Sequence, residues 1–310
     1  MAGYLRPEKV LITGGTGYLG ARIGQFLTER GYQVSLGSRE PFKSGDISGC
    51  HQVTTNWQDP ELEFCIGYDC IIHAAGMNAK DCAESPEAGF HFNGICTEKL
   101  IKASIKAGCK SFFYLSTVHI YDAPLVGCFA ETSPACNSHP YATSHFYGEQ
   151  KLVDALKTRE IKGGVLRLSN CFGSSVLGNG DHWELVLNQF VRDAVTKNEI
   201  TIAGNCLSQR DFLPISELVQ VVERIFNYEG SIPNTINLSS GVSITLEKAA
   251  DIVADTIFAE TGRKVSISKS QQAVDTGDLV IKNTALNAMG IHVSNDLTQE
   301  IRELIRNLDS

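Results

Sequence analysis

The sequence has no long apolar run. Its opening segment, residues 1–13, contains only Val10, Leu11 and Ile12 as consecutive apolar residues, too few for the core of a signal peptide. No window approaches the roughly 20 apolar residues that a helix needs to cross a bilayer. We therefore expect a cytoplasmic protein with no membrane partner.

Paired cysteines are missing as well. Ten cysteines lie between Cys50 and Cys206, none forms a C-x-x-C pair, and the nearest approach is Cys65 with Cys70. Metal sites and redox motifs require tight, paired spacing. We expect free, mostly buried thiols in a reducing compartment and no metal site.

Blocks of basic residues are also absent, and the formal net charge is −8. A chain of this charge repels phosphate-rich polymers, which argues against a nucleic-acid partner. The 310 residues, 43% hydrophobic and 20% charged, have the composition of an ordinary globular protein. This length accommodates one large domain, or a medium domain with a smaller partner.

In the first half, short apolar runs alternate with segments of helical periodicity. Single helices between buried strands indicate right-handed βαβ units and a parallel sheet. The expected strands are 9–13, 32–36, 69–74, 111–116 and 164–168, and the expected helices are 17–30, 87–107 and 141–156.

The pattern becomes less regular after residue 170. Short strands are expected at 200–203 and 235–238, and helices at 183–196, 216–228, 245–261 and 297–308. The predicted fold is α/β: a Rossmann doubly wound parallel sheet with a smaller C-terminal α/β substrate-binding lobe. We assign 1–170 to the dinucleotide-binding domain, with segments near 205–240 returning to it, and 171–310 to the lobe.

A glycine-rich turn directly follows the first strand and has the spacing G-x-x-G-x-x-G. Gly14 permits the tight turn, Gly17 lets the backbone approach a pyrophosphate, and Gly20 lets the new helix lie close to the sheet. The N–H groups that open the helix favour phosphate. The expected cofactor-binding residues of this turn are Gly14, Thr16, Gly17, Tyr18, Leu19 and Gly20.

The end of the second strand predicts which dinucleotide binds. An acidic residue there would bind the ribose 2′-hydroxyl and exclude a 2′-phosphate. This chain has Gly37, Ser38 and Arg39 instead. A guanidinium pairs well with phosphate, and Ser38 can donate to it, so the sequence favours NADP over NAD.

These features, with later motifs, resemble the short-chain dehydrogenase/reductase superfamily, in particular its extended branch of NAD(P)-dependent nucleotide-sugar epimerases and dehydratases. The motifs run from residue 13 to residue 212: T-G-G-T-G-Y-L-G at 13–20, D-C-I-I-H-A-A-G at 69–76, N-G-I-C-T from Asn93, Y-L-S-T-V-H-I-Y at 114–121, Tyr141, L-R-L-S-N at 166–170 and R-D-F at 210–212. The resemblance implies a seven-stranded sheet, a sugar-binding lobe, cofactor contacts at Ala74, Ala75, Gly76 and Asn93, and a homodimer formed through helices 87–107 and 141–156.

By the same resemblance, Thr117 binds the reacting oxygen, with Ser116 as its neighbour. A neutral hydroxyl both donates to and accepts from that oxygen. Tyr141 takes the place of the general acid/base, because a phenol can move the alcohol proton as hydride is transferred.

One departure from the family pattern concerns the residue four positions after Tyr141. The family has lysine there, and this chain has His145 on the same helical face. A permanent cation about 6 Å away, at an effective dielectric of ~20, lowers the tyrosine pKa by about two units. Three readings stay open: an enzyme that works with His145 and gains activity at lower pH, an enzyme with altered chemistry, and a protein that binds without catalysis.

His119 is a further catalytic hypothesis. It lies where dehydratases and decarboxylases of this family carry a glutamate, and an imidazole there could abstract a proton next to a ketone. Val118 stands where dehydratases have an aspartate, so the usual pair is broken.

On the substrate side, Arg210 matches the family's arginine for a nucleotide diphosphate, since a guanidinium binds phosphate oxygens in pairs. Asn170 matches an asparagine that contacts the same group, and Asn205, Trp183 and Phe190 are looser candidates. A surface ion pair of Arg210 with Asp211 or Glu217 is the alternative. The function hypotheses are a nucleotide-sugar epimerase or dehydratase, an NADPH-dependent ketone reductase, and a catalytically weak or inactive cofactor-binding protein.

Overall fold

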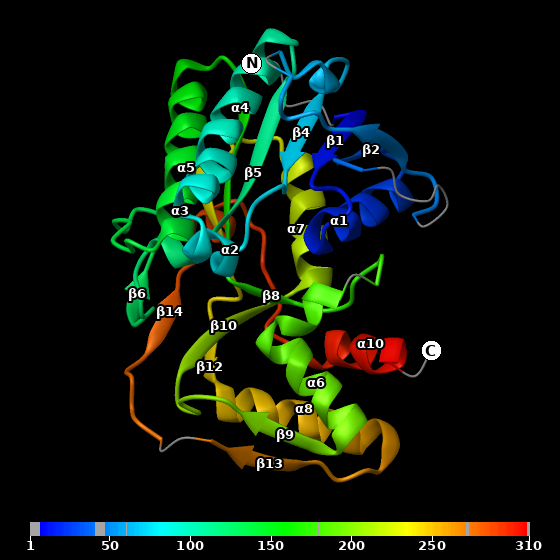
Figure 1. Ribbon diagram of the computed structural model, residues 1–310, viewed down its shortest axis with the longest axis vertical. Coiled ribbons are helices and arrows are strands. Elements are labelled where there is room, and N and C mark those ends of the chain that lie inside the picture. Colours follow the sequence, from blue (N-terminus) through cyan, green and yellow to red (C-terminus); the bar gives the residue numbers. More distant parts are fainter. Residues whose placement is uncertain (1–6, 41–46, 60, 179, 271–272, 309–310) are drawn as a thin grey trace.

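The computed structural model describes residues 7–40, 47–59, 61–178, 180–270 and 273–308. Its centre is a seven-stranded parallel sheet in the order β11-β7-β5-β4-β1-β2-β3 (Figure 1). The strands are β1 (Lys9–Thr13), β2 (Gln33–Ser38), β3 (His51–Thr54), β4 (Cys70–His73), β5 (Ser111–Thr117), β7 (Lys162–Leu168) and β11 (Thr235–Leu238). The expected Rossmann-like α/β fold is confirmed.

Both faces of this sheet are apolar, which is typical of parallel strands covered on two sides. Leu11 belongs to one core cluster, and its neighbours Val10 and Ile12 belong to the other. Helices α1 (Tyr18–Glu29) and α7 (Ile215–Phe226) cover one face, and α4 (Thr97–Lys106) and α5 (Pro140–Thr158) cover the opposite face (Figure 1).

The order of the strands reverses at β1. The chain passes from β1 to β2 on one side, whereas β4 pairs with β1 on the other. The loops that follow β1 and β4 therefore leave the same edge of the sheet at a topological switch point, which is where ligands bind in open α/β sheets.

The helix expected at 87–107 is present as one continuous helical run over residues 86–106, but its middle part is π-helical and a further short helix precedes it. The chain forms α2 (Ala79–Glu84), α3 (Pro86–Gly89), a π-helical segment η2 (Phe90–Cys96) and then α4. Glycines let η2 and α5 approach closely, since a Cβ on Gly148 would lie 3.0 Å from the carbonyl oxygen of Asn93. The side chain of Asn93 meanwhile binds the loop after β4, so local contacts override the helical period.

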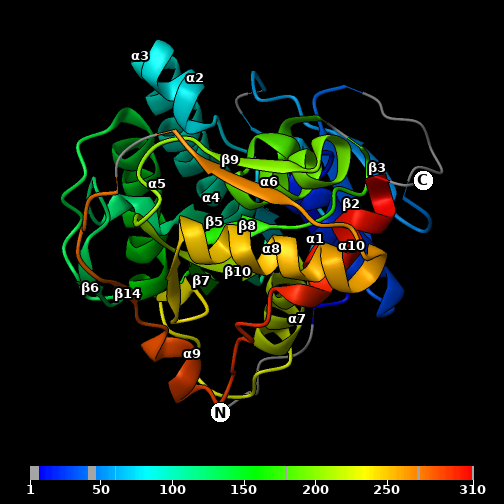
Figure 2. The ribbon, with the colours of Figure 1, turned by 90° about the horizontal axis from the view of Figure 1, so that it is seen from below.

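The C-terminal residues form a second core. Helices α6 (Val186–Lys197), α8 (Leu246–Thr261) and α10 (Thr298–Leu308) enclose it, beside β9 (Glu199–Ile202) and β13 (Ser266–Lys269) (Figure 2). A small sheet of β8 (Asn170–Phe172), β10 (Gln209–Pro214) and β12 (Ser243–Thr245) leads from the first sheet into this lobe. The minor elements are η1 (Glu63–Cys65), η3 (Val118–Ile120), β6 (Gly127–Phe129), η4 (Gly180–Glu184), β14 (Leu279–Ile281) and α9 (Thr284–Ala288).

All ten cysteines are free thiols. In the described part of the chain, no helix has the length and apolar character needed to span a membrane. Across the same residues, no three His, Cys, Asp or Glu side chains gather into a group that could hold a metal.

Candidate active site

The glycine turn after β1 is packed too tightly for larger residues. Gly14 has φ +68°, and a Cβ there would lie 2.7 Å from the backbone nitrogen of Ala75. A Cβ on Gly20 would lie 2.3 Å from the carbonyl oxygen of Gly14. Gly17 is exposed at the N-terminus of α1, without a side-chain cap or an acidic residue in the first turn. This geometry fits the pyrophosphate of a dinucleotide.

The other residues of the turn line or support it. Thr16 is partly exposed, while Tyr18 and Leu19 pack against the main core, Tyr18 also stacking on His182 at 6.0 Å between ring centroids. At the end of β2, the buried hydroxyl of Ser38 donates to the carbonyl oxygen of Glu40, so its proton is not available to a phosphate. Arg39 is exposed.

The loop after β4 is held by Asn93. Its Oδ1 accepts from the Met77 backbone at 2.7 Å, and its Nδ2 donates to the Met77 carbonyl at 3.1 Å. Asn93 is fully buried, whereas Ala74 and Ala75 are partly exposed and Gly76 is exposed. Asn93 therefore shapes the loop, and residues 74–76 form its accessible surface.

Thr117 and Tyr141 meet where β5 ends and α5 begins. The Thr117 hydroxyl lies near enough to Tyr141 to lower the pKa of its phenol, and Thr117 Oγ1 accepts from the backbone of His119 at 3.1 Å. Burial raises the pKa of Tyr141 to about 12, against the smaller opposing effect of the Thr117 hydroxyl. The phenol is therefore protonated at neutral pH. Ser116 points elsewhere, because its hydroxyl donates to the buried Glu149.

His145 lies one turn after Tyr141, with the two ring centroids 4.5 Å apart in an edge-on arrangement. Burial lowers the pKa of His145 to about 4, so the imidazole is neutral at pH 7. This disfavours the reading in which a charged His145 raises activity at mildly acidic pH. Lys151 does not replace the missing cation, since its Nζ lies over the Tyr147 ring at 4.9 Å.

Asn170 and Arg210, both suggested for the substrate side, come together with His119 beside the candidate catalytic hydroxyls. Asn170 Nδ2 donates to the Asp211 carbonyl at 3.0 Å, which leaves its Oδ1 to accept from His119. Burial and the nearby guanidinium of Arg210 lower the pKa of His119, so this imidazole is neutral as well.

Arg210 is partly buried, and its pKa is lowered by that burial. Its NH1 donates to the Gln209 carbonyl at 2.8 Å, and no ion pair among the described residues includes it. Asp211 binds the backbone of Ser240 and Gly241 instead. The surface ion pair considered above is therefore not formed, and the guanidinium has donors left for an anion.

The remaining candidates lie in the lobe. Asn205 uses both amide atoms on Val274, as donor to its carbonyl at 2.6 Å and acceptor from its N–H at 3.1 Å, so it has little left for a ligand. Phe190 is buried in the lobe core, and Trp183 packs against that core. These contacts do not support a place for Asn205, Phe190 or Trp183 in the wall of a substrate pocket.

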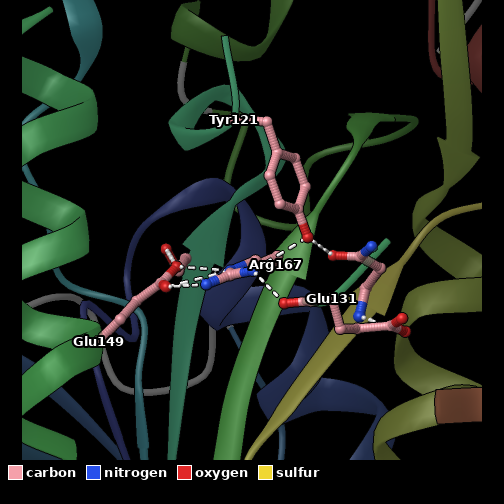
Figure 3. A network of polar contacts seen from close by, with 6 residues as sticks. Tyr121, Glu131, Glu149 and Arg167 are labelled. Atoms are coloured by element: carbon pink, nitrogen blue, oxygen red, sulfur yellow. Dashed lines mark hydrogen bonds and ion pairs between the residues drawn. The ribbon is translucent and has the colours of Figure 1, made fainter. Parts of the chain in front are cut away.

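The sequence did not reveal a buried network behind the catalytic residues. Arg167 on β7 binds Glu149 of α5 through two nitrogens and donates to the hydroxyl of Tyr121 at 3.0 Å (Figure 3). Tyr121 in turn donates to Asn237 Oδ1 at 2.6 Å. The available signal was a charged residue inside the apolar strand L-R-L, which must have a partner when buried.

A doubly wound sheet with a glycine turn at its switch point and a Thr–Tyr pair beside it defines a dinucleotide-dependent class of α/β protein. The chain belongs to the NAD dependent epimerase/dehydratase family, whose model matches residues 10–239.

Individual relatives are more distant. The chain is 27% identical over 183 residues to UDP-glucose 4-epimerase of Azospirillum brasilense, a match that covers 55% of this chain and only about half, 51%, of that protein. It is 23% identical over 314 residues to dTDP-6-deoxy-L-talose 4-dehydrogenase (NAD(P)(+)) of Kitasatospora kifunensis, covering 98% and 96% of the two chains. The solved structure of UDP-glucose 4-epimerase with UDP-glucose from Thermotoga maritima has a TM-score of 0.82 at 20% identity, covering 97% of this chain and 98% of that one. This structural similarity is evidence for the fold alone.

Proposed function

We propose that the protein is an oxidoreductase of the epimerase/dehydratase type that acts on a nucleotide diphosphate sugar with NAD or NADP. The observation that carries this proposal is the contact of Tyr141 with both Thr117 and His145, beside the loop after β4. The Thermotoga structure contains UDP-glucose, and another structural neighbour, MoeE5 (TM-score 0.78), contains UDP-glucose and NAD, which supports both ligand classes. We further propose 1–170, together with α7 and β11, as the dinucleotide-binding part and the rest of 171–310 as the substrate lobe.

In this proposal the chain's own residues position and protonate the sugar. Thr117 holds the reacting oxygen, and Tyr141, which is protonated at neutral pH, donates to it or accepts its proton after ionising. The nicotinamide supplies a hydride acceptor or donor when bound. The neutral His145 holds a ribose hydroxyl but contributes no positive charge to Tyr141.

His119 is proposed to donate to the nearby Asn170 through one ring nitrogen and to face the sugar with the other, which is then unprotonated. Such an imidazole can accept a proton next to a ketone at neutral pH. Arg210 is proposed to bind the diphosphate, since its guanidinium matches two phosphate oxygens.

The low pKa of His145 supports a second candidate function. With its pKa lowered to about 4, the imidazole leaves Tyr141 a weak acid, which favours a protein that binds dinucleotide and turns over slowly or not at all. A ketone reductase is the third alternative.

Cofactor retention separates these functions. Purified protein is denatured and its released nucleotides are identified, after which NAD, NADP, UDP-glucose and dTDP-glucose are titrated. An epimerase should retain dinucleotide through purification and bind a nucleotide sugar, whereas a reductase should release oxidised dinucleotide and consume NADPH. Binding of both ligands without turnover supports the inactive protein, and absence of any dinucleotide binding would overturn the proposal.

The family resemblance also predicts a homodimer through the η2–α4 and α5 helices. Phe90 at the start of η2 is 39% exposed and contacts Tyr147 of α5, with ring centroids 5.0 Å apart. Sedimentation analysis of the Phe90→Glu variant beside the unmodified protein tests this surface; loss of a dimer in the variant is the expected result.

A further inference from the structure

Three aromatic rings from three elements are stacked behind the proposed ribose site. The ring of Tyr114 on β5 lies between those of His73 on β4 and His145 on α5, at centroid distances of 5.3 Å and 5.7 Å and interplanar angles of 20°. The exposed fractions of His73, Tyr114 and His145 are 1%, 1% and 5%. Because these rings are almost entirely removed from water, their protein neighbours decide where most of their protons lie.

The proton positions can be followed from His73. The hydroxyl of Thr97 donates its single proton to the Asn93 carbonyl at 2.7 Å, so it must accept from Nε2 of His73 at 2.9 Å. Nδ1 of His73 then carries a lone pair and accepts from the hydroxyl of Thr13 at 2.6 Å. His73 is thus a neutral imidazole with its proton on Nε2.

Tyr114 has one proton and two acceptors within reach. Nδ1 of His145 is 2.7 Å from the phenol oxygen, and the Asn93 carbonyl is 3.3 Å away and already accepts from Thr97. Two arrangements satisfy these contacts: the phenol donates to Nδ1 of His145 over the shorter distance, or it donates to the Asn93 carbonyl and accepts from an Nδ1–H of His145. The first arrangement is favoured, because the Asn93 carbonyl already accepts from Thr97. In that arrangement His145 carries its own proton on Nε2.

This nitrogen faces the accessible loop. A Cβ on Gly76 would lie 3.8 Å from Nε2 of His145 and 3.7 Å from Cε1, so this edge of the ring is directed at the exposed glycine after β4. A lysine at position 145 would offer donors in any rotamer, whereas a neutral imidazole offers one there in only one of its two tautomers.

We propose that Tyr114 is a positioning residue that holds His145 in the Nε2–H tautomer, so that His145 donates a hydrogen bond to a dinucleotide ribose hydroxyl at Gly76. This rests on the proposed function for the identity of the ligand. Tyr114 touches neither sugar nor dinucleotide and acts only through His145.

The tautomer is measurable on unmodified protein without ligand. Long-range ¹H–¹⁵N spectra of protein labelled at histidine nitrogens distinguish protonated from unprotonated ring nitrogens, and His145→Gln identifies the His145 signals. The expected result is a protonated Nε2 in the wild type and a mixture of tautomers in Tyr114→Phe, which keeps the ring stack. A protonated Nδ1 in the wild type, or an unchanged pattern in Tyr114→Phe, would overturn the proposal.

A double-mutant cycle tests the consequence for binding. Dissociation constants of NAD and NADP are compared for wild type, Tyr114→Phe, His145→Lys and the double variant. Tyr114→Phe should weaken binding about tenfold in the wild-type background and less than about twofold in the His145→Lys background, because an ammonium needs no tautomer. An equal loss in both backgrounds would mean that Tyr114 acts on the fold alone. If the wild type binds no dinucleotide, the proposed function fails, and the spectra still decide the tautomer.

Discussion

Arg167 and Glu149 form a buried two-pronged ion pair that joins strand β7 to helix α5. The Nε of Arg167 lies 3.0 Å from Oε2 of Glu149 and its NH2 lies 2.6 Å from the same oxygen, while the side chains are only 7% and 2% exposed. The carboxylate also accepts from Ser116 on β5. Glu149 therefore fixes the helix that carries Tyr141 and His145 to two strands, to β7 through Arg167 and to β5, which ends at Thr117, through Ser116.

Removing one partner of this pair should be costly. Arg167→Met leaves the Glu149 carboxylate buried without a cation, and we expect the free energy of unfolding to fall by about 3–5 kcal/mol. Lys157→Met is the control, since Lys157 forms an exposed pair with Asp154 at 3.6 Å and should change stability by less than about 1 kcal/mol. Urea unfolding measures both, and equal effects would contradict the structural role of the pair.

Restoring lysine at position 145 should alter the acidity of Tyr141. The phenol has a pKa of about 12 beside the neutral imidazole, and a cation about 6 Å away lowers a tyrosine pKa by roughly two units. His145→Lys should therefore move the alkaline rise in turnover to lower pH by about two units. His145→Ala should weaken dinucleotide binding and slow turnover. If the alanine variant and the wild type are equally active, His145 does not hold the ribose.

Acid should destabilise the protein through its buried imidazoles. Burial lowers the pKa of His73 to about 3 and that of His145 to about 4, both below the ordinary value of 6.5. Below pH 6.5 these histidines bind protons in the unfolded chain but stay neutral in the folded chain. The stabilisation from keeping them neutral is therefore complete above pH 6.5 and is lost as the pH falls toward 4. Each histidine contributes up to about 1.4 kcal/mol per pH unit.

The variant His145→Gln should reduce this pH slope of the unfolding free energy. His51→Gln, at an exposed position on β3, is the matched control and should leave the slope unchanged. Unfolding by urea at several pH values between 4 and 7 gives the slopes. A slope that is the same in all three proteins would show that His145 is not kept neutral by the fold.

Arg39 should decide the choice of dinucleotide. Its exposed guanidinium follows β2, and Ser38 donates its proton to the Glu40 carbonyl, so among the described residues at the end of β2 the NADP binding expected from the sequence would depend on Arg39. Arg39→Asp should weaken NADP binding by more than about tenfold and change NAD binding by less than about threefold. Arg306→Gln on α10 is the control. Tighter binding of NAD than of NADP by the wild type would contradict the preference.

Arg210 should bind the diphosphate of the sugar nucleotide. Loss of a charge-assisted hydrogen bond in Arg210→Gln should weaken UDP-glucose or dTDP-glucose binding by about 10- to 100-fold and leave dinucleotide binding unchanged. Arg302→Gln, which removes an exposed partner of Glu260, should affect neither. Calorimetric titration with the sugar nucleotide and with the dinucleotide distinguishes a loss of sugar-nucleotide binding alone from a loss of both binding activities.

The sequence predicted the strands and helices in which apolar residues recur with a regular spacing. The strand at 9–13 is observed as β1, because its residues are apolar on both faces of a covered sheet. The helix at 87–107 was predicted, but its π-helical middle part was not, since that part depends on contacts of Gly94 with α5 and of Asn93 with the loop after β4. The strands β8 and β12, with three residues each, are too short for a periodic signal.

Only those residues of the candidate site that belong to sequence motifs could be predicted. They identified Thr117, Tyr141 and His145, which the fold brings together. Tyr114 was missed because S-F-F-Y-L-S is typical of an apolar strand. A phenol inside such a strand requires a hydrogen-bond partner, and that requirement was the available signal.

The edge strand β11 pairs with β7 although about 70 residues separate them in the chain. A growing polypeptide therefore cannot finish its nucleotide-binding sheet until much of the lobe has left the ribosome. For the same reason, a fragment that ends after residue 170 would expose the unpaired edge of β7, which promotes aggregation, and would not fold as an independent domain.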